Sequence, residues 1–287
     1  MKRIMKRFLK YLLPLFIVMA VIGCDQKPDV IVHGQPVEEQ PIGCAGGQCS
    51  AEVVDSVLNT EPEVVDSVPV FALKYHILVL EDSIKLTGEE INDINYAHQR
   101  LNEAYHGEIE FDMDTSFNYI TSGLTLDTIY NDYLYNGKPA LQTQYGQLIS
   151  EHNVDGFINI YVLKTNVSPN GQKLMGFTPV MSQSPSSYYL QKGEFDAMGI
   201  SFEGLYEYET GSTLIHEMGH WFGLKHPWQY TDEQKKELGL DTDLEFCVNH
   251  MNYSCFVDRF TPQQIKFQNT YGIAYRYYVI KEWRAKK

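Results

Sequence analysis

The chain has 287 residues and a formal net charge of -14, and 44% of its residues are hydrophobic. This composition excludes disordered and collagen-like proteins, and the length allows one or two compact domains. Beyond five basic residues within the first ten, no cluster of Lys and Arg is large enough to neutralise a run of phosphates. Nucleic acid is therefore not an expected partner.

Residues 1–23 are predicted to form a signal peptide. The basic start is followed by an uncharged, mostly apolar run from Tyr11 to Gly23, which is too short for a membrane-spanning helix of about 20 residues. The sequence Val21-Ile22-Gly23-Cys24 resembles a bacterial lipobox, so Cys24 is the expected lipidation site; an ordinary signal peptide with an incidental cysteine is the alternative. We expect an exported lipoprotein anchored to a membrane by acyl chains, at the outer membrane or cell surface rather than the inner membrane.

Residues 24–70 are predicted to be an acidic tether or a pro-segment. The stretch is rich in Pro and acidic residues and poor in aromatics, so it buries too little apolar surface to fold on its own. The sequence of 52–57 recurs unchanged at 63–68, and two copies are too few for a repeat fold. A duplication that lengthens a spacer explains the pattern.

Residues 71–287 are predicted to form the folded domain. Its first elements are a strand, a helix that Thr87 and Glu90 open with a capping box, and a second strand. Two later segments are predicted to form a central strand and a strand that precedes the His216–His226 stretch. A third is predicted to form an edge strand that could pair with an extended substrate. The five strands are expected at Phe71–Leu80, Gly107–Phe111, Gly156–Leu163, Met175–Val180 and Ala197–Phe202.

The stretch from His216 to His226 carries the chemistry. On a helix, His216 and His220 lie one turn apart on the same face, so both imidazoles can reach one zinc ion. Glu217 lies beside them and can hydrogen-bond a water at the metal. Gly223 can end the helix in the left-handed conformation, and the turn brings His226 in as the third ligand. Three neutral imidazoles leave a fourth position open, as in catalytic zinc sites. Ser212 or Thr210 is expected to cap the helix.

This motif resembles the extended signature of the metzincin zinc peptidases. The resemblance implies a metzincin-like zincin with an α+β fold: a twisted mixed β-sheet with a backing helix and an active-site helix. A smaller C-terminal subdomain holds a Met-turn and a C-terminal helix, with the boundary between subdomains at about residue 223. The Asn249–Ser254 stretch is similar to the Met-turn, which makes Met251 the residue beneath the zinc. Tyr253 then matches a tyrosine that stabilises the tetrahedral intermediate.

Within the metzincins, the zinc motif and the Asn249–Tyr253 pattern most resemble the pappalysin-like peptidases. A membrane-anchored, zinc-dependent metalloproteinase lipoprotein of the Bacteroides type is the most similar kind. Only 22 residues separate His226 from Asn249, so the calcium sites of the longer family members cannot be carried over. Asp241, Asp243 and Glu245 could still hold calcium in a loop, but a solvated acidic turn is the simpler interpretation.

The last predicted helix opens at Thr261, with Pro262 in its first turn and Gln264 completing a capping box, and runs to Ile280. Cys247 and Cys255 flank the Met-turn, and a disulfide between them would clamp it; two buried thiols are the alternative.

Three interpretations of Cys44 and Cys49 stay open. The pair could form a small disulfide loop, supply a thiolate that blocks the zinc, or bind metal by itself, although it offers two ligands where structural zinc uses four.

The sequence therefore predicts a monomeric, membrane-anchored zinc endopeptidase with one catalytic Zn²⁺ and polypeptide substrates. Glu217 is the expected general base and acid, and Tyr253 is expected to stabilise the oxyanion. The alternative is a non-proteolytic surface-binding lipoprotein with a structural zinc site.

Overall fold

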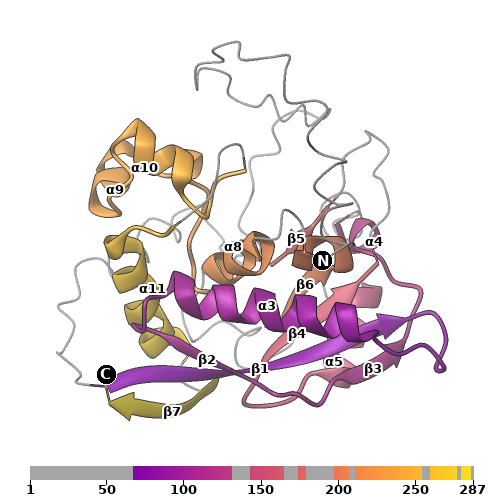
Figure 1. The fold of residues 1–287 in the computed structure, drawn as a ribbon. Coiled ribbons are helices and arrows are strands. Elements are labelled where there is room, and N and C mark those ends of the chain that lie inside the picture. Colours follow the sequence, from indigo (N-terminus) through magenta and orange to yellow (C-terminus); the bar gives the residue numbers. More distant parts are fainter. Residues whose placement is uncertain are drawn as a thin grey trace, which may run out of the picture. The chain divides into compact units, whose positions relative to one another are not determined.

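The computed structural model describes residues 67–130, 143–164, 174–178, 197–206, 211–253, 259–276 and 279–285. These form the predicted α+β fold, a twisted mixed sheet with helices packed on it (Figure 1). No helix in these ranges is both long and apolar enough to cross a bilayer. The predictions for the signal peptide, for Cys24, Cys44 and Cys49, and for Cys255 fall outside the described residues.

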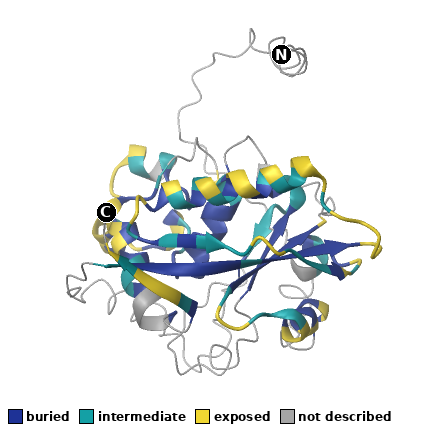
Figure 2. Ribbon diagram, turned by 60° about the horizontal axis from the view of Figure 1, so that its bottom comes forward, coloured by how far each residue is buried: buried dark blue, intermediate teal, exposed yellow. Residues whose placement is uncertain are grey.

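Strand β1 (Ser67–Val79) is the spine of the sheet. It begins before the predicted start at Phe71 and is 13 residues long, which lets it pair with four strands. The parallel strands β2 (Glu110–Met113) and β3 (Asn118–Thr121) follow one another along one edge. On the other edge lie β7 (Ile280–Ala285), which is antiparallel, and β4 (Ile158–Leu163), which is parallel. Almost every β1 residue is buried, as expected for a strand covered on both faces (Figure 2).

Helix α3 (Gly88–Ala104) covers one face of the sheet. The predicted capping box is present, since the Thr87 side chain accepts from the Glu90 backbone N–H and Glu90 accepts from the Thr87 backbone N–H. The side chains of Ile94, Ala97 and Leu101 are buried in the core, while the outer side of the helix is exposed (Figure 2). The capping signal and the apolar spacing together specify this helix.

Beyond β4 the sheet continues through β6 (Ala197–Ser201) to β5 (Gly176–Phe177), in the order β1-β4-β6-β5. Strand β4 is fully buried, which confirms the predicted central strand. Strand β5 pairs antiparallel with β6 and is the last strand on this side of the sheet among the described residues, which matches the predicted edge strand. Three further helices flank this half: α4 (Leu126–Tyr130), α5 (Gln144–His152) and α7 (Phe202–Tyr206).

The C-terminal part differs in one respect from the prediction. Thr261 and Gln264 form the expected capping box at the start of α11 (Pro262–Tyr275). The prediction that this helix runs to Ile280 is wrong, because Ile280–Ala285 form β7 beside β1. Pairing with β7 satisfies the backbone N–H and carbonyl groups along one edge of the first half of β1. A longer helix would leave these groups without β7 as their partner.

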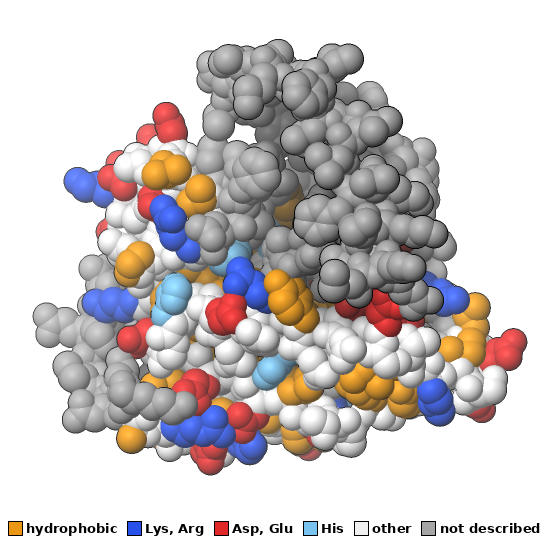
Figure 3. Space-filling model, in the orientation of Figure 1, with side chains coloured by type: hydrophobic (Ala, Val, Ile, Leu, Met, Phe, Trp, Pro, Cys, Tyr) orange, Lys and Arg blue, Asp and Glu red, His pale blue; other side chains and the backbone are white. Residues whose placement is uncertain are grey.

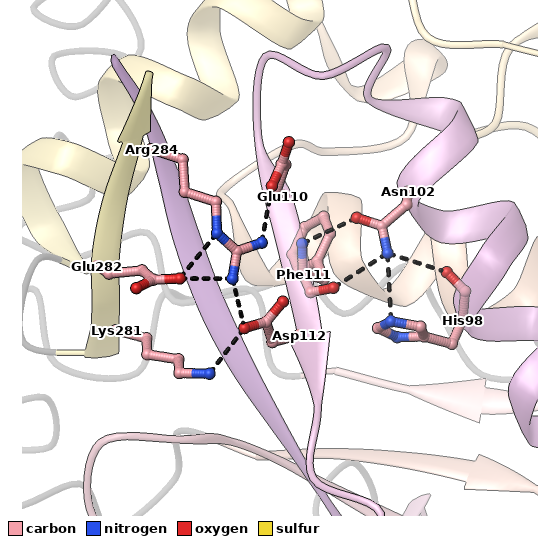
Figure 4. A network of polar contacts seen from close by, with 8 residues as sticks. All are labelled: His98, Asn102, Glu110, Phe111, Asp112, Lys281, Glu282 and Arg284. Atoms are coloured by element: carbon pink, nitrogen blue, oxygen red, sulfur yellow. Dashed lines mark hydrogen bonds and ion pairs between the residues drawn. The ribbon is translucent and has the colours of Figure 1, made fainter. Parts of the chain in front are cut away.

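Charged side chains hold β7 in register from across β1. Arg284 donates to Glu110 at 2.9 Å and to Asp112 at 2.8 Å, and Lys281 donates to Asp112 at 2.7 Å (Figure 4). On the same β2 segment, Asn102 of α3 pairs with both backbone polar groups of Phe111. In the space-filling view, acidic and basic side chains lie next to one another along the bottom of the molecule (Figure 3). Exposed ion pairs of this kind contribute about 0–1 kcal/mol each, so they specify register more than stability.

Candidate metal centre

Helix α8 (Ser212–Trp221) carries His216, Glu217 and His220, and all three side chains are buried. The helix is capped by Gly211 at φ 63°, without a side-chain hydrogen bond. The cap predicted for Ser212 is therefore wrong, and Thr210 lies outside the described residues. A methyl group at Gly211 would lie 3.0 Å from Cα of Ala97, so close packing on α3 and the left-handed backbone both favour glycine there.

The C-terminus of α8 turns sharply at Gly223, which has φ 87°. The N–H of Leu224 donates to the carbonyl of Gly219 and the N–H of Gly223 to the carbonyl of His220, both at 2.9 Å. These two bonds define a Schellman turn. A methyl group at Gly223 would lie 2.8 Å from the ring of Tyr271, so the turn also requires the absence of a side chain. The turn directs the chain back so that His226 reaches the face of α8 that holds the other two histidines.

The Nε2 atoms of the three histidines converge on one point. Nε2 of His226 lies 3.1 Å from Nε2 of His220 and 3.3 Å from Nε2 of His216. A tetrahedral zinc ion with Zn–N bonds of about 2.0–2.1 Å requires nitrogen atoms about 3.3 Å apart. Within the described part of the chain, this is the one group of three His, Cys, Asp or Glu residues placed to hold a metal ion. The donor set fits zinc, and no fourth His, Cys, Asp or Glu of the described residues joins it, so within this part of the chain a further coordination position is left open.

Two backbone carbonyls orient the rings of the helical histidines. Nδ1 of His216 lies 2.7 Å from the carbonyl of His250, and Nδ1 of His220 lies 2.8 Å from the carbonyl of Leu224. A carbonyl only accepts, so both rings carry their proton on Nδ1 and present the Nε2 lone pair to a metal. Burial lowers the pKa of His216 to about 4 and that of His226 to about 3, so both are neutral at pH 7, as metal binding requires.

The carbonyl of His250 belongs to a tight turn beneath α8. The N–H of Asn252 donates to the carbonyl of Asn249 at 2.9 Å, and the N–H of Met251 donates to the Asn249 side chain at 3.0 Å. The Asn249 amide also pairs reciprocally with the Gln264 amide, which ties the turn to α11. Met251 is fully buried, and a methyl group at Gly219 would clash with its sulfur. The structure thus brings Met251 directly under the metal-binding helix.

Tyr253 and Trp228 flank His226. The hydroxyl of Tyr253 lies 2.6 Å from Nε2 of His226, and its ring centroid lies 5.0 Å from that of His216. The Trp228 ring stacks on His226 at 4.5 Å between centroids with an interplanar angle of 11°. Sequence reasoning missed Trp228. The signal that could have identified it is its position two residues after the third histidine. The short η4 helix (Pro227–Gln229) folds the Trp228 ring back onto the His226 ring.

Glu217 occupies a buried position next to edge strand β5. Its side chain lies so close to Gly176 that a methyl group there would be 2.5 Å from Oε1, and Oε2 has no hydrogen-bond partner among the described residues. Burial raises the pKa of Glu217 to about 8. A divalent cation held by the histidines would favour the charged carboxylate and lower this pKa.

The other predicted site residues do not join this group. Asp243 and Glu245 lie in helix α10 (Asp243–Val248) rather than in a loop, and Glu245 is ion-paired with Arg259 at 2.8 Å. Asp241 lies just before this helix and, in the described part of the chain, forms no metal-binding group with them. The backbone of Cys247 is in α10, but its side chain and all of Cys255 fall outside the described residues, so the predicted disulfide stays a prediction.

No protein-family model and no curated protein sequence matches the chain. Among solved structures, a promirolysin mutant from Tannerella forsythia is similar, with a TM-score of 0.52 and 16% identity over 81% of this chain and 91% of that one. Mature mirolysin from the same organism, in complex with a cleaved peptide, has a TM-score of 0.45 and 14% identity over 77% and 97% of the two chains. Metalloproteinase-II from Bacteroides fragilis has a TM-score of 0.34 and 15% identity over 76% and 60%. The likeness to promirolysin shows a shared fold.

Adding zinc to the metal-free chain is expected to raise its melting temperature by about 5–10 °C when zinc is present at about 100 times its Kd. His220→Ala should abolish the shift, because it removes a ligand from the cluster, whereas His152→Ala, at the end of α5, should keep it. Differential scanning calorimetry measures all three. A full shift in His220→Ala would contradict the site.

Proposed function

We propose that the chain is a zinc-dependent endopeptidase. The observation that carries the proposal is the group of three neutral imidazoles around one point, with the buried Glu217 carboxylate on the adjoining residue of the same helix. The resemblance of the zinc motif to the pappalysin-like metzincins and the fold shared with promirolysin both support it.

His216, His220 and His226 would hold the zinc ion. As a Lewis acid, a zinc ion in this position would lower the pKa of a bound water and polarise the scissile carbonyl. Glu217 takes the proton from the attacking water and delivers it to the leaving amine. Its Oε2 is buried and has no other partner among the described residues, so it is available for this transfer.

Tyr253 supplies a hydrogen-bond donor for the oxyanion that develops on the substrate. Its hydroxyl lies against Nε2 of His226, the atom that faces the metal position, while the ring itself is exposed. A hydrogen bond donated to the carbonyl oxygen as it becomes an oxyanion stabilises the transition state more than the ground state. The same hydroxyl can move from His226 to the oxyanion by rotation of an exposed side chain.

Strand β5 offers main-chain groups to an extended polypeptide substrate. The carbonyl of Met175 accepts from the N–H of Ser201 in β6 at 2.8 Å. Hydrogen-bonding direction alternates along a strand, so the N–H and carbonyl of the next residue, Gly176, point away from β6. A peptide added as a further strand would use these groups and pass beside Glu217.

We further propose that residues 1–23 direct export and that a lipid on Cys24 anchors the enzyme to a membrane. Residues 25–66, which precede β1, would then serve as the tether between the lipid and the catalytic domain. The support is the lipobox-like sequence and the composition of the segment.

Glu217→Ala should keep zinc binding and lose peptidase activity by about 10³-fold or more, because the metal ligands remain while the proton acceptor is gone. Cleavage of a peptide library, with and without a chelator, together with zinc content by mass spectrometry, measures both effects. Glu151→Ala, an exposed carboxylate on α5, is the matched control. Activity of Glu217→Ala equal to this control would refute the mechanism. A parent chain that cleaves nothing would favour the surface-binding alternative.

Tyr253→Phe should lower kcat by about 10²-fold, the typical effect of losing one oxyanion donor, with zinc affinity unchanged. Steady-state kinetics on a peptide cleaved by the parent measure it. Tyr96→Phe, an exposed tyrosine on α3, is the control. If kcat is unchanged and only KM rises, Tyr253 binds substrate without stabilising the oxyanion.

Cys24→Ser should abolish incorporation of labelled palmitate and release the chain from the membrane fraction, because the acyl acceptor is removed. Metabolic labelling and fractionation of cells expressing the two forms test this. Equal labelling of both forms would show that Cys24 is not the lipid site.

A further inference from the structure

We propose that Gly176 is a positioning residue for Glu217: its missing side chain lets edge strand β5 lie directly on the catalytic carboxylate. This inference rests on the proposed peptidase function. A methyl group at Gly176 would lie 2.5 Å from Oε1 of Glu217, 2.6 Å from Cγ and 2.8 Å from Cδ. Nonbonded carbon atoms prefer separations of about 3.5–4.0 Å, so no side chain fits there while Glu217 keeps its place.

The need for glycine at 176 comes from space and not from backbone conformation. The described glycines with positive φ are at 107, 156, 211, 223 and 239, and Gly176 is not among them. An alanine could therefore adopt this backbone without strain. An alanine would meet the stem of Glu217 as well as its carboxylate oxygen, since Cγ and Cδ would lie only 0.1 and 0.3 Å farther away than Oε1.

Neither side of the contact can withdraw easily. On the helix side, His216 and His220 are tied to backbone carbonyls, and Gly219 lies on the sulfur of Met251. On the strand side, β5 is bonded to β6 through Met175, and α7 packs against it so closely that a methyl group at Gly204 would lie 2.6 Å from the Met175 carbonyl. The side chain of Glu217 is therefore the part that must move when residue 176 gains a Cβ.

The consequence concerns catalysis rather than metal binding. The three atoms nearest to a methyl group at Gly176 all belong to Glu217 and none to a histidine, so we expect zinc affinity to depend little on this position. Displacing a catalytic group by about 1 Å can lower the rate by about 10²-fold. Gly176 also directs its main-chain groups away from β6, toward the edge that no described strand occupies, so one residue sets the spacing between the general base and the substrate backbone.

The first test is kinetic. In the zinc-loaded full chain, Gly176→Ala should lower kcat by about 10–100-fold with zinc content unchanged. Gly123→Ala, whose Cβ would meet nothing within 4 Å, is the matched control and should be fully active. In a Glu217→Asp background, where the carboxylate stem is shorter, Gly176→Ala should change the rate by less than about threefold. Activity of Gly176→Ala equal to that of Gly123→Ala, or the same loss in both backgrounds, would overturn the proposal.

The second test needs no activity. In the metal-free full chain, Gly176→Ala should lower the melting temperature by about 2–8 °C, because overpacking is relieved only in part. In a Glu217→Ala background the loss should fall below about 2 °C, since the clashing atoms are gone. An equal loss in both backgrounds would overturn the contact. If the parent cleaves no peptide, the peptidase proposal fails, and this thermal cycle still decides whether Gly176 and Glu217 are coupled.

Discussion

The candidate metal site depends on two hydrogen bonds that fix the histidine rings of α8. The carbonyls of His250 and Leu224 accept from Nδ1 of His216 and His220, which leaves both Nε2 atoms free to bind a metal. Each carbonyl belongs to a turn whose own geometry is fixed: the Schellman turn at Gly223 and the turn at Asn249–Asn252. The helix, the two turns and the metal ligands thus form one unit. A change in either turn would reorient a histidine ring even though the turn itself does not contact the metal.

Three glycines make this unit possible because they lack side chains where two elements meet. Gly219 lets Met251 lie under the helix, Gly223 lets Tyr271 pack on the turn, and Gly176 lets β5 approach Glu217. Packed interiors accommodate extra atoms poorly, so each contact transmits a change in one element to the next. Strand β5, Glu217 and the Met251 side chain beneath α8 are in this way linked by direct contact.

Much of the site could be predicted from the sequence because its signals are local. The spacing of the three histidines, the glycine at the helix end and the capping boxes at Thr87 and Thr261 all act within about three helical turns or less. The same holds for β4, whose residues are all apolar or aromatic except Asn159 and fit a strand buried on both faces. Where residues close in the chain determine the local structure, that structure can be predicted from the sequence.

The features that were missed depend on contacts between distant segments. Strand β7 forms by pairing with an edge of β1, which lies more than 200 residues earlier in the chain. Taken alone, the residues of β7 resemble the end of a helix. The packing of Gly176 on Glu217 likewise joins two segments that no local pattern connects. The same is true of the Asn249–Gln264 amide pair, which holds the turn beneath the metal site.

If three histidines form an open zinc site, zinc K-edge X-ray absorption on the zinc-loaded full chain will show their nitrogen atoms around the ion. The structure predicts three nitrogen ligands at about 2.0–2.1 Å and one further light ligand, with no sulfur. A sulfur ligand at about 2.3 Å, or a fourth protein nitrogen, would contradict an open catalytic site.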